Sequence, residues 1–298
     1  MKMEPQDNKQ KVRKFYDEIG WSLEDSGFYQ NARYEDLRPV SAEYIHKCHL
    51  RITPYFQKGG KFLLDVGCGP IQYPEYLTYS EKFEKRVCAD ISITALREAR
   101  KRIGDKGFFV VCDAANLPFT DECMDGMVSL HTFHHLEISE QKKAWEETYR
   151  VLKTDSPAVV VNGWTESGMM KKWQKRMEAA EKAGNFIAKL RGKNTKPKEE
   201  KKNTKAAKEK GTFVKKMDAE WVHRELSGLG NGNVTVEIRC WRSVSVRWLR
   251  ALIHKPYGQA ALRALFAKEE ADPQYYGEYG QYPMIIMRKT GKEKEANV

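Results

Sequence analysis

The chain has 298 residues and a mass of 34.5 kDa, with 41% hydrophobic and 31% charged residues, so one large domain with a buried core is expected and global disorder is excluded. No apolar run reaches the roughly 18 to 20 residues that a membrane-spanning helix needs, and the first residues lack the apolar stretch of a secretory signal. We therefore expect a soluble, cytoplasmic protein whose six cysteines, with no CxxC pair, are reduced thiols rather than disulfides or metal ligands.

The net charge of +11 is concentrated in one segment. Residues 189–216 carry twelve Lys or Arg against three Glu, which leaves only +2 for the rest of the chain. This Lys-rich segment is low in apolar residues, and we expect it to be mobile and solvated. It could neutralise phosphates, but it has no aromatic residue between Leu190 and Gly211 on which bases could stack, so nucleic acid is an unlikely partner on this evidence.

Strands and helices are expected to alternate through residues 61–164. Five short apolar runs are typical of buried strands and lie at 62–66, 86–90, 108–112, 126–130 and 158–161. One helix is expected between Ser92, as its N-cap, and Gly104, and another is expected to begin at Ser139. Such alternation builds right-handed crossovers, a parallel sheet and helices on both of its faces. Residues 61–164 are therefore predicted to be an α/β core.

The flanking segments are predicted to be mainly helical. Residues 1–60 would form an N-terminal helical cap, and residues 165–230 a helical insertion that contains the Lys-rich segment. Residues 231–298 would supply the closing strands, near 234–240 and 284–287, around a second helical insertion at 246–280. An apolar stripe between Met170 and Leu190 faces away from several lysines, which fits a substrate cap, an extra packed helix or a peripheral membrane contact.

The first predicted strand ends in a glycine turn with an acid beside it. The motif is Asp65-x-Gly67-x-Gly69, and its glycines allow the backbone to approach a ligand at the carboxyl edge of the sheet. A dinucleotide fingerprint would need a third glycine where this chain has Gln72. The motif therefore indicates a nucleoside ligand without favouring NAD.

Two further acids follow the next predicted strands. Asp90 lies 21 residues after Gly69, where its carboxylate can accept hydrogen bonds from both hydroxyls of a ribose. Asp113, followed by Ala114, ends the third strand and can accept from an exocyclic amine. Three acids with no phosphate-binding lysine suit an adenosine ligand that is cationic and lacks phosphates, a description that S-adenosylmethionine fits.

The core resembles the class I S-adenosylmethionine-dependent methyltransferases, particularly the type 11 group that includes ubiquinone-biosynthesis-like enzymes. The matching segments are residues 64–69, 90–92, 112–114, 117–119, 129–136 and 150–153. The resemblance implies a Rossmann-like seven-stranded sheet, mostly parallel with the last strand antiparallel, and helical lid insertions. It also implies S-adenosylmethionine as the methyl donor and S-adenosylhomocysteine as the product.

Carried over by position, the resemblance implies a role for nine residues at the strand ends. These are Asp65, Gly67 and Gly69 along the methionine and ribose, Asp90 and Ile91 at the ribose and adenine, Asp113 and Ala114 at the adenine edge, and Leu130 and His131 beneath the sulfonium. The stretch 12–18 resembles the helix that covers the donor in such enzymes, so Tyr16 is expected to close over the methionine, and Arg33 or Tyr34 over the acceptor. One departure is Ile71, where the family often has glycine; we expect helical dihedrals there and a side chain that narrows the pocket floor.

Methyl transfer is an in-line displacement, and it needs a general base only when the acceptor is a hydroxyl, a thiol or a protonated amine. His131 is the candidate base, because it ends the fourth strand and an ordinary imidazole titrates near pH 7. His134 and His135 are expected to pack or to form local hydrogen bonds. No metal site is expected, since no third ligand accompanies His131 and His135.

The sequence favours a methyltransferase that acts on a small or medium organic acceptor, more often at oxygen than at nitrogen or carbon. Two alternatives stay open. One is an RNA or protein methyltransferase guided by the Lys-rich segment, and the other is a module that binds S-adenosylmethionine without transferring its methyl group.

Overall fold

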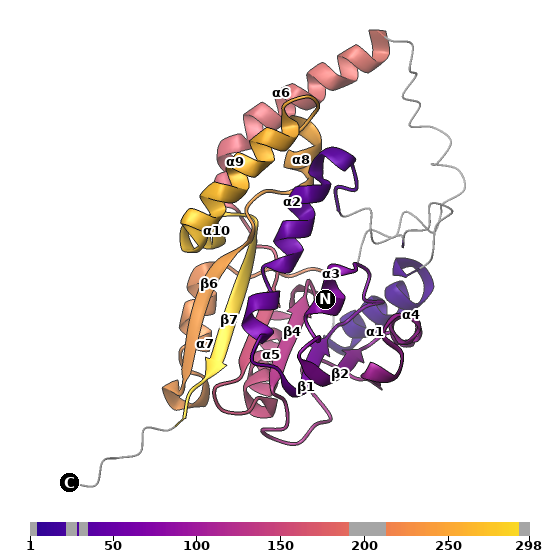
Figure 1. The fold of residues 1–298 in the computed structure, drawn as a ribbon, viewed down its shortest axis with the longest axis vertical. Coiled ribbons are helices and arrows are strands. Elements are labelled where there is room, and N and C mark those ends of the chain that lie inside the picture. The colour runs from indigo at the N-terminus through magenta and orange to yellow at the C-terminus, as the bar shows by residue number, and fades with distance from the viewer. Residues whose placement is uncertain (1–4, 22–28, 30–34, 191–212, 292–298) are drawn as a thin grey trace, which may run out of the picture.

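A seven-stranded sheet forms the centre of the molecule in the computed structural model, which describes residues 5–21, 29, 35–190 and 213–291 (Figure 1). Its strands are β1 (Gly60–Val66), β2 (Phe83–Asp90), β3 (Gly107–Val111), β4 (Gly126–Leu130), β5 (Pro157–Val161), β6 (Val234–Arg242) and β7 (Tyr282–Lys289). They lie in the order β3-β2-β1-β4-β5-β7-β6, and β7 runs antiparallel to the other six. This confirms the predicted mostly parallel sheet with an antiparallel last strand. The strand order reverses between β1 and β4, which is where open α/β sheets bind their ligands.

The apolar runs explain the central strands. Every residue of β5 is buried, as is every residue of β4 except Leu130, because helices cover both faces of the sheet. One face packs against α5 (Ile138–Val151) and α7 (Ala219–Leu226), around the fully buried Trp145. The opposite face packs against the short turn η3 (Thr53–Phe56) and against Tyr79.

Helix ends follow the predicted capping chemistry with one exception. Ser92 Oγ accepts a hydrogen bond from Ala95 N at 3.1 Å and starts α4 (Ile93–Ile103), which ends at Gly104 with a φ of 56°. Helix α5 begins at Ile138, one residue before the predicted start at Ser139. Its N-cap is Glu137, whose carboxylate makes no capping bond and instead accepts from Asn8 Nδ2 at 2.7 Å.

A second layer of helices lies at one end of the sheet (Figure 1). It consists of α2 (Pro39–Leu50), α6 (Gly168–Leu190), α8 (Val246–Leu252) and α9 (Gly258–Ala271). Met170 and Met177 of α6 pack with Trp248 of α8 and Tyr44 of α2 in a hydrophobic cluster of their own. Helices predicted in three separate segments of the chain therefore form one layer. None of the described helices is long and apolar enough to cross a membrane.

The predicted N-terminal cap is divided between two places. Helix α2 joins the helical layer, whereas α1 (Pro5–Phe15) and the π-helical turn η1 (Tyr16–Gly20) lie over the sheet edge near α4. Short helix α3 (Glu75–Thr78) follows the turn after β1, and short helix α10 (Pro273–Tyr279) packs on β6 and β7. Arg33, Tyr34 and residues 191–212 of the Lys-rich segment lie outside the described residues.

Candidate active site

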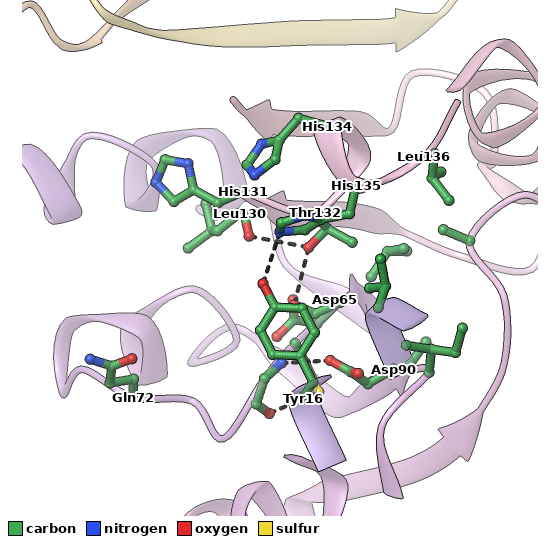
Figure 2. Close-up of a pocket in the computed structure, with 18 of the residues that line it drawn as sticks. Tyr16, Asp65, Gln72, Asp90, Leu130, His131, Thr132, His134, His135 and Leu136 are labelled. Atoms are coloured by element: carbon green, nitrogen blue, oxygen red, sulfur yellow. Dashed lines mark hydrogen bonds between the residues drawn. The ribbon is translucent and has the colours of Figure 1, made fainter. Parts of the chain in front are cut away.

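A cavity of about 490 Å³ lies at the carboxyl edge of the sheet, a volume typical of small-molecule sites. Figure 2 shows part of its lining. All ten residues predicted for the site lie in its wall: Tyr16, Asp65, Gly67, Gly69, Asp90, Ile91, Asp113, Ala114, Leu130 and His131. The sheet topology thus brings together residues that are up to 115 positions apart in the chain.

The glycine turn after β1 depends on its two glycines. Gly67 and Gly69 have φ values of 67° and 54°, in the left-handed region that glycine adopts without strain. A Cβ on Gly67 would lie 2.1 Å from Thr132 Oγ1, and one on Gly69 would lie 3.1 Å from the ring of Trp21. Trp21 is a cavity residue that the sequence analysis missed, and it stacks on Tyr16 at 5.3 Å between ring centroids.

Asp90 presents a buried carboxylate to the cavity (Figure 2). One oxygen accepts from Gly69 N at 2.9 Å and the other from Ser92 N at 2.8 Å. Burial raises the pKa of Asp90 to about 6, although these two backbone N–H groups favour the charged form. Each oxygen keeps a lone pair, so the carboxylate can still accept two hydrogen bonds from a ligand.

The other two predicted acids are already paired. Asp65 Oδ2 accepts from Arg86 Nη2 at 2.5 Å, and both side chains are buried. Asp113 Oδ2 lies 2.5 Å from Lys9 Nζ, which also pairs with Glu140. Lys9 belongs to α1, so the carboxylate expected to meet an exocyclic amine also ties the covering helix to the sheet edge. Lys9 also lines the cavity, and sequence reasoning missed it because no motif marks it.

The expectations for Ile71 are wrong. Its φ is 51°, so the backbone keeps the left-handed conformation that glycine usually supplies and is not helical. Its side chain does not narrow the cavity, because it is fully buried on the other side of the turn with Cys88, Leu96 and Ala99.

Tyr16 closes over the cavity through a hydrogen bond to His135. His135 Nδ1 donates to the carbonyl of Phe213 at 2.8 Å, so its Nε2 accepts from the Tyr16 hydroxyl, also at 2.8 Å (Figure 2). His134 Nδ1 lies 3.1 Å from Asn162 Oδ1. Both histidines form the expected local bonds, but they also line the cavity.

His131 is a neutral imidazole at physiological pH. Its ring packs against Trp241 and Tyr282, with centroid distances of 5.1 and 5.5 Å. Burial, reinforced by Arg242, lowers the pKa of His131 to about 3. This pKa lies well below the expected titration near pH 7, because packing against Trp241 and Tyr282 shields much of the ring from water.

The part of the cavity away from Asp90 contains charged residues that sequence reasoning missed. Glu35 and Arg242 form a buried ion pair in its wall. Burial raises the pKa of Glu35, but Arg242 and then His49 outweigh it and hold the pKa at about 2. Lys216 lines the same region. Glu35 and Arg242 are 207 positions apart, so no short motif could have indicated the pair.

Comparisons with known proteins agree with this geometry. Residues 64–160 match a family model, of type 11, described as a methyltransferase domain. Residues 64–160 form a methyltransferase domain. The matched segment of this methyltransferase domain contains the glycine turn, Asp90 and the three cavity histidines.

Curated relatives match the methyltransferase domain over part of their length. The tRNA (carboxymethyluridine(34)-5-O)-methyltransferase of Arabidopsis thaliana is 28% identical over 157 residues, which cover 45% of this chain and 37% of that protein. A Homo sapiens protein with the name probable tRNA methyltransferase 9B is 30% identical over 122 residues, or 40% of this chain and 25% of that protein. The chain thus spans well under half the length of these relatives.

The fold is also shared with a solved structure. Phosphoethanolamine N-methyltransferase 1 of Haemonchus contortus, in complex with phosphoethanolamine and S-adenosylhomocysteine, superposes with a TM-score of 0.57. The alignment covers 98% of this chain and 51% of that one at 10% sequence identity, so it shows the fold alone.

Proposed function

We propose that this chain transfers a methyl group from S-adenosylmethionine to an oxygen atom of a small or medium organic acceptor. The observation that carries the proposal is a single cavity that extends from the Asp90 end of the sheet to a region lined by His131, Lys216 and Tyr282. One end suits a nucleoside, and the other can exclude water from a second molecule. The name of the Arabidopsis relative describes transfer to oxygen, which supports that acceptor atom.

The cavity residues fit the donor. Asp90 retains two acceptor positions for the ribose hydroxyls, and Gly69 has no Cβ where the ligand must pass beneath Trp21. Ile91, Asp113 and Ala114 would border the adenine, and Asp65 and Gly67 the methionine. When bound, the donor supplies a methyl carbon that its sulfonium already activates.

The chain's own contribution is alignment and the exclusion of water. Tyr16 and Trp21 would cover the donor from above, with Leu130 and His131 beneath the reacting carbon. Because its pKa is lowered to about 3, His131 is a weak base, and we assign it to hydrogen bonding with the acceptor rather than to proton removal.

An RNA acceptor is the second candidate, since the curated relatives bear the names of tRNA methyltransferases. In that case residues 189–216 would bind phosphates. A module that binds the donor without transfer is the third, and incubation with radiolabelled donor and a cell extract separates it from both enzymes.

Thermal unfolding tests the donor assignment. At a hundred times its dissociation constant, S-adenosylmethionine or S-adenosylhomocysteine should stabilise the protein by about 2.7 kcal/mol, roughly 2 to 4 °C, and NAD should not. Asp90→Ala should lose the shift. Burial raises the pKa of Asp90 to about 6, so this carboxylate is charged, and accepts hydrogen bonds from the ribose, only above that pH. The ligand-induced shift in unfolding temperature should therefore be full at pH 8 and shrink as the pH falls through 6. No shift from either sulfur nucleoside would refute the assignment.

A further inference from the structure

Lys216 is a cation in the wall of the cavity with no counterion among the described residues. Its Nζ lies next to Gly163, where an added Cβ would come within 3.1 Å of it. Burial lowers the pKa of Lys216, and no carboxylate within residues 5–21, 35–190 or 213–291 acts to raise it. Gly163 follows β5, so the ammonium lies on the side of the cavity away from the Asp90 end.

The backbone around Lys216 is fixed to the methyltransferase domain on both sides. Lys215 N donates to the carbonyl of His134 at 2.7 Å. Thr165 Oγ1 donates to the carbonyl of Lys216 at 2.8 Å, and Thr165 N donates to that of Met217 at 3.1 Å. Met217 is itself buried in the core. The last residue of the Lys-rich segment is therefore held at the cavity and is not part of a solvated loop.

The charge at this end of the cavity is unbalanced. Arg242 is neutralised by Glu35, and Arg86 by Asp65, so these two pairs contribute no net charge. Lys216 leaves one positive charge in a partly desolvated place, where an unpaired ion is costly. An acceptor with a negative charge is the partner that would neutralise the ammonium of Lys216.

Three described residues of the cavity wall that could take a proton from an acceptor are weak bases at pH 7. Burial lowers the pKa of His131 to about 3 and that of His135 to about 4, and the pKa of Glu35 is held at about 2. A hydroxyl acceptor would need a stronger base. A carboxylic acid does not, because it is already ionised at this pH.

We propose that Lys216 binds the carboxylate of the acceptor and that this carboxylate is methylated to a methyl ester; this rests on the proposed function. A lone pair of one carboxylate oxygen forms the new O–C bond while the S–C bond breaks. The electron pair of that bond passes to sulfur, which becomes a neutral thioether, and no proton moves. The buried amide Nε2 of Gln72, which has no acceptor among the described residues and lines the same cavity, offers a further donor.

Binding of a charged probe and its neutral counterpart tests the role of Lys216. Protein saturated with S-adenosylhomocysteine is titrated with benzoate and with benzamide in a calorimeter. Wild type should bind benzoate about tenfold or more tightly than benzamide. Lys216→Met should abolish this preference and Lys216→Arg should keep most of it, because arginine retains the charge.

Equal affinities for the two probes in wild type, or a preference that survives in Lys216→Met, would overturn the proposal. The titration is repeated without the nucleoside, so that it still measures the role of Lys216 if the donor assignment fails. Undiminished stabilisation of both variants by S-adenosylhomocysteine shows that the donor end is intact.

The product identifies the methylated atom. Protein is incubated with donor labelled in its methyl group and with a cell extract, and the products are treated with mild base. A methyl ester is hydrolysed and releases volatile labelled methanol, whereas ethers and methylamines keep the label. Base-stable label in the products would rule out the carboxylate as nucleophile. Equal loss of transfer in Lys216→Arg and Lys216→Met would instead make Lys216 a base and contradict its assigned role.

Discussion

Two residues near the cavity have left-handed backbone dihedrals although they are not glycine. They are Ile71, after β1, with a φ of 51°, and His131, after β4, with a φ of 56°. Such residues cost about 1 to 3 kcal/mol each and persist where the surrounding structure compensates. Ile71 is compensated by complete burial of its side chain, and His131 by packing against Trp241 and Tyr282. The side chain of His131 lines the cavity, whereas that of Ile71 does not.

At position 71 the glycine variant should be more stable than the alanine variant, which reverses their usual order of stability. Both substitutions remove a buried side chain, at a cost of about 2 to 5 kcal/mol. Only glycine relieves the left-handed backbone, so Ile71→Gly should be more stable than Ile71→Ala by about 1 kcal/mol in urea unfolding.

Leu96 provides the matched control, because it is buried in the same cluster but lies in α4. There Leu96→Gly should be less stable than Leu96→Ala by about 1 kcal/mol. If Ile71→Gly also proved less stable than Ile71→Ala, the left-handed backbone at this position would be refuted.

At the scale of elements, α1 and η1 act as a cover that is held by polar bonds at its edges. Lys9 pairs with Asp113 and Glu140, and Asp17 accepts from Ser92 Oγ at 2.6 Å. Tyr16 adds the bond to His135. Polar bonds of this kind can open without disrupting the core, which is what a cover over an exchanging ligand requires.

Removing the ammonium of Lys9 should loosen this cover. Lys9→Met breaks the ion pairs with Asp113 and Glu140, so S-adenosylhomocysteine should dissociate about three to ten times faster, and amide exchange in α1 should speed up. The unfolding midpoint should change little, because the packing of the hydrophobic core stays as it is. Stopped-flow dissociation and hydrogen-exchange mass spectrometry measure the two effects.

Lys47→Met removes a comparable ion pair, with Glu43, from the exposed face of α2, and should leave both rates unchanged. Dissociation from Lys9→Met at the wild-type rate would show that the cover does not control ligand exit.

The central elements could be predicted because each is determined by its own residues. The apolar runs of β1 to β5 and the cap at Ser92 need no information from distant parts of the chain. Helix α10 lies inside the predicted helical insertion at 246–280, but no apolar face marked it as a separate helix, since its stretch contains Gly277 and tyrosines. Asp272 caps it by accepting from Tyr275 N at 3.1 Å. The start of α5 was misplaced because Glu137 binds Asn8, a partner 129 positions away.

For the molecule as a whole, the two ends of the cavity differ in how far sequence could describe them. The donor end is built from strand ends, so parallel topology alone brings Gly69 and Asp90 together. The other end takes Glu35, Lys216 and Arg242 from three separate segments. Their meeting depends on how those segments return over the sheet, which no local pattern specifies. Sequence therefore indicated the donor more closely than the acceptor.

The charge of the whole molecule supplies the test between the two acceptor classes. Residues 191–212 contain nine of the twelve basic residues of the Lys-rich segment, and Lys216 is not among them. Replacing residues 191–212 with a Gly-Ser linker of equal length removes these nine basic residues and keeps Lys216 at the cavity. For a small carboxylate acceptor, the rate of transfer to the base-labile product should stay within about twofold of wild type. This rate should respond weakly to salt, because one ion pair remains.

An RNA methyltransferase would behave differently, because its affinity for total tRNA would fall. The slope of log affinity against log salt concentration would also flatten, by about 0.7 to 0.9 for each phosphate that the variant no longer neutralises. Labelled methyl groups recovered in the RNA fraction of wild type, and absent from it in the variant, would decide for RNA.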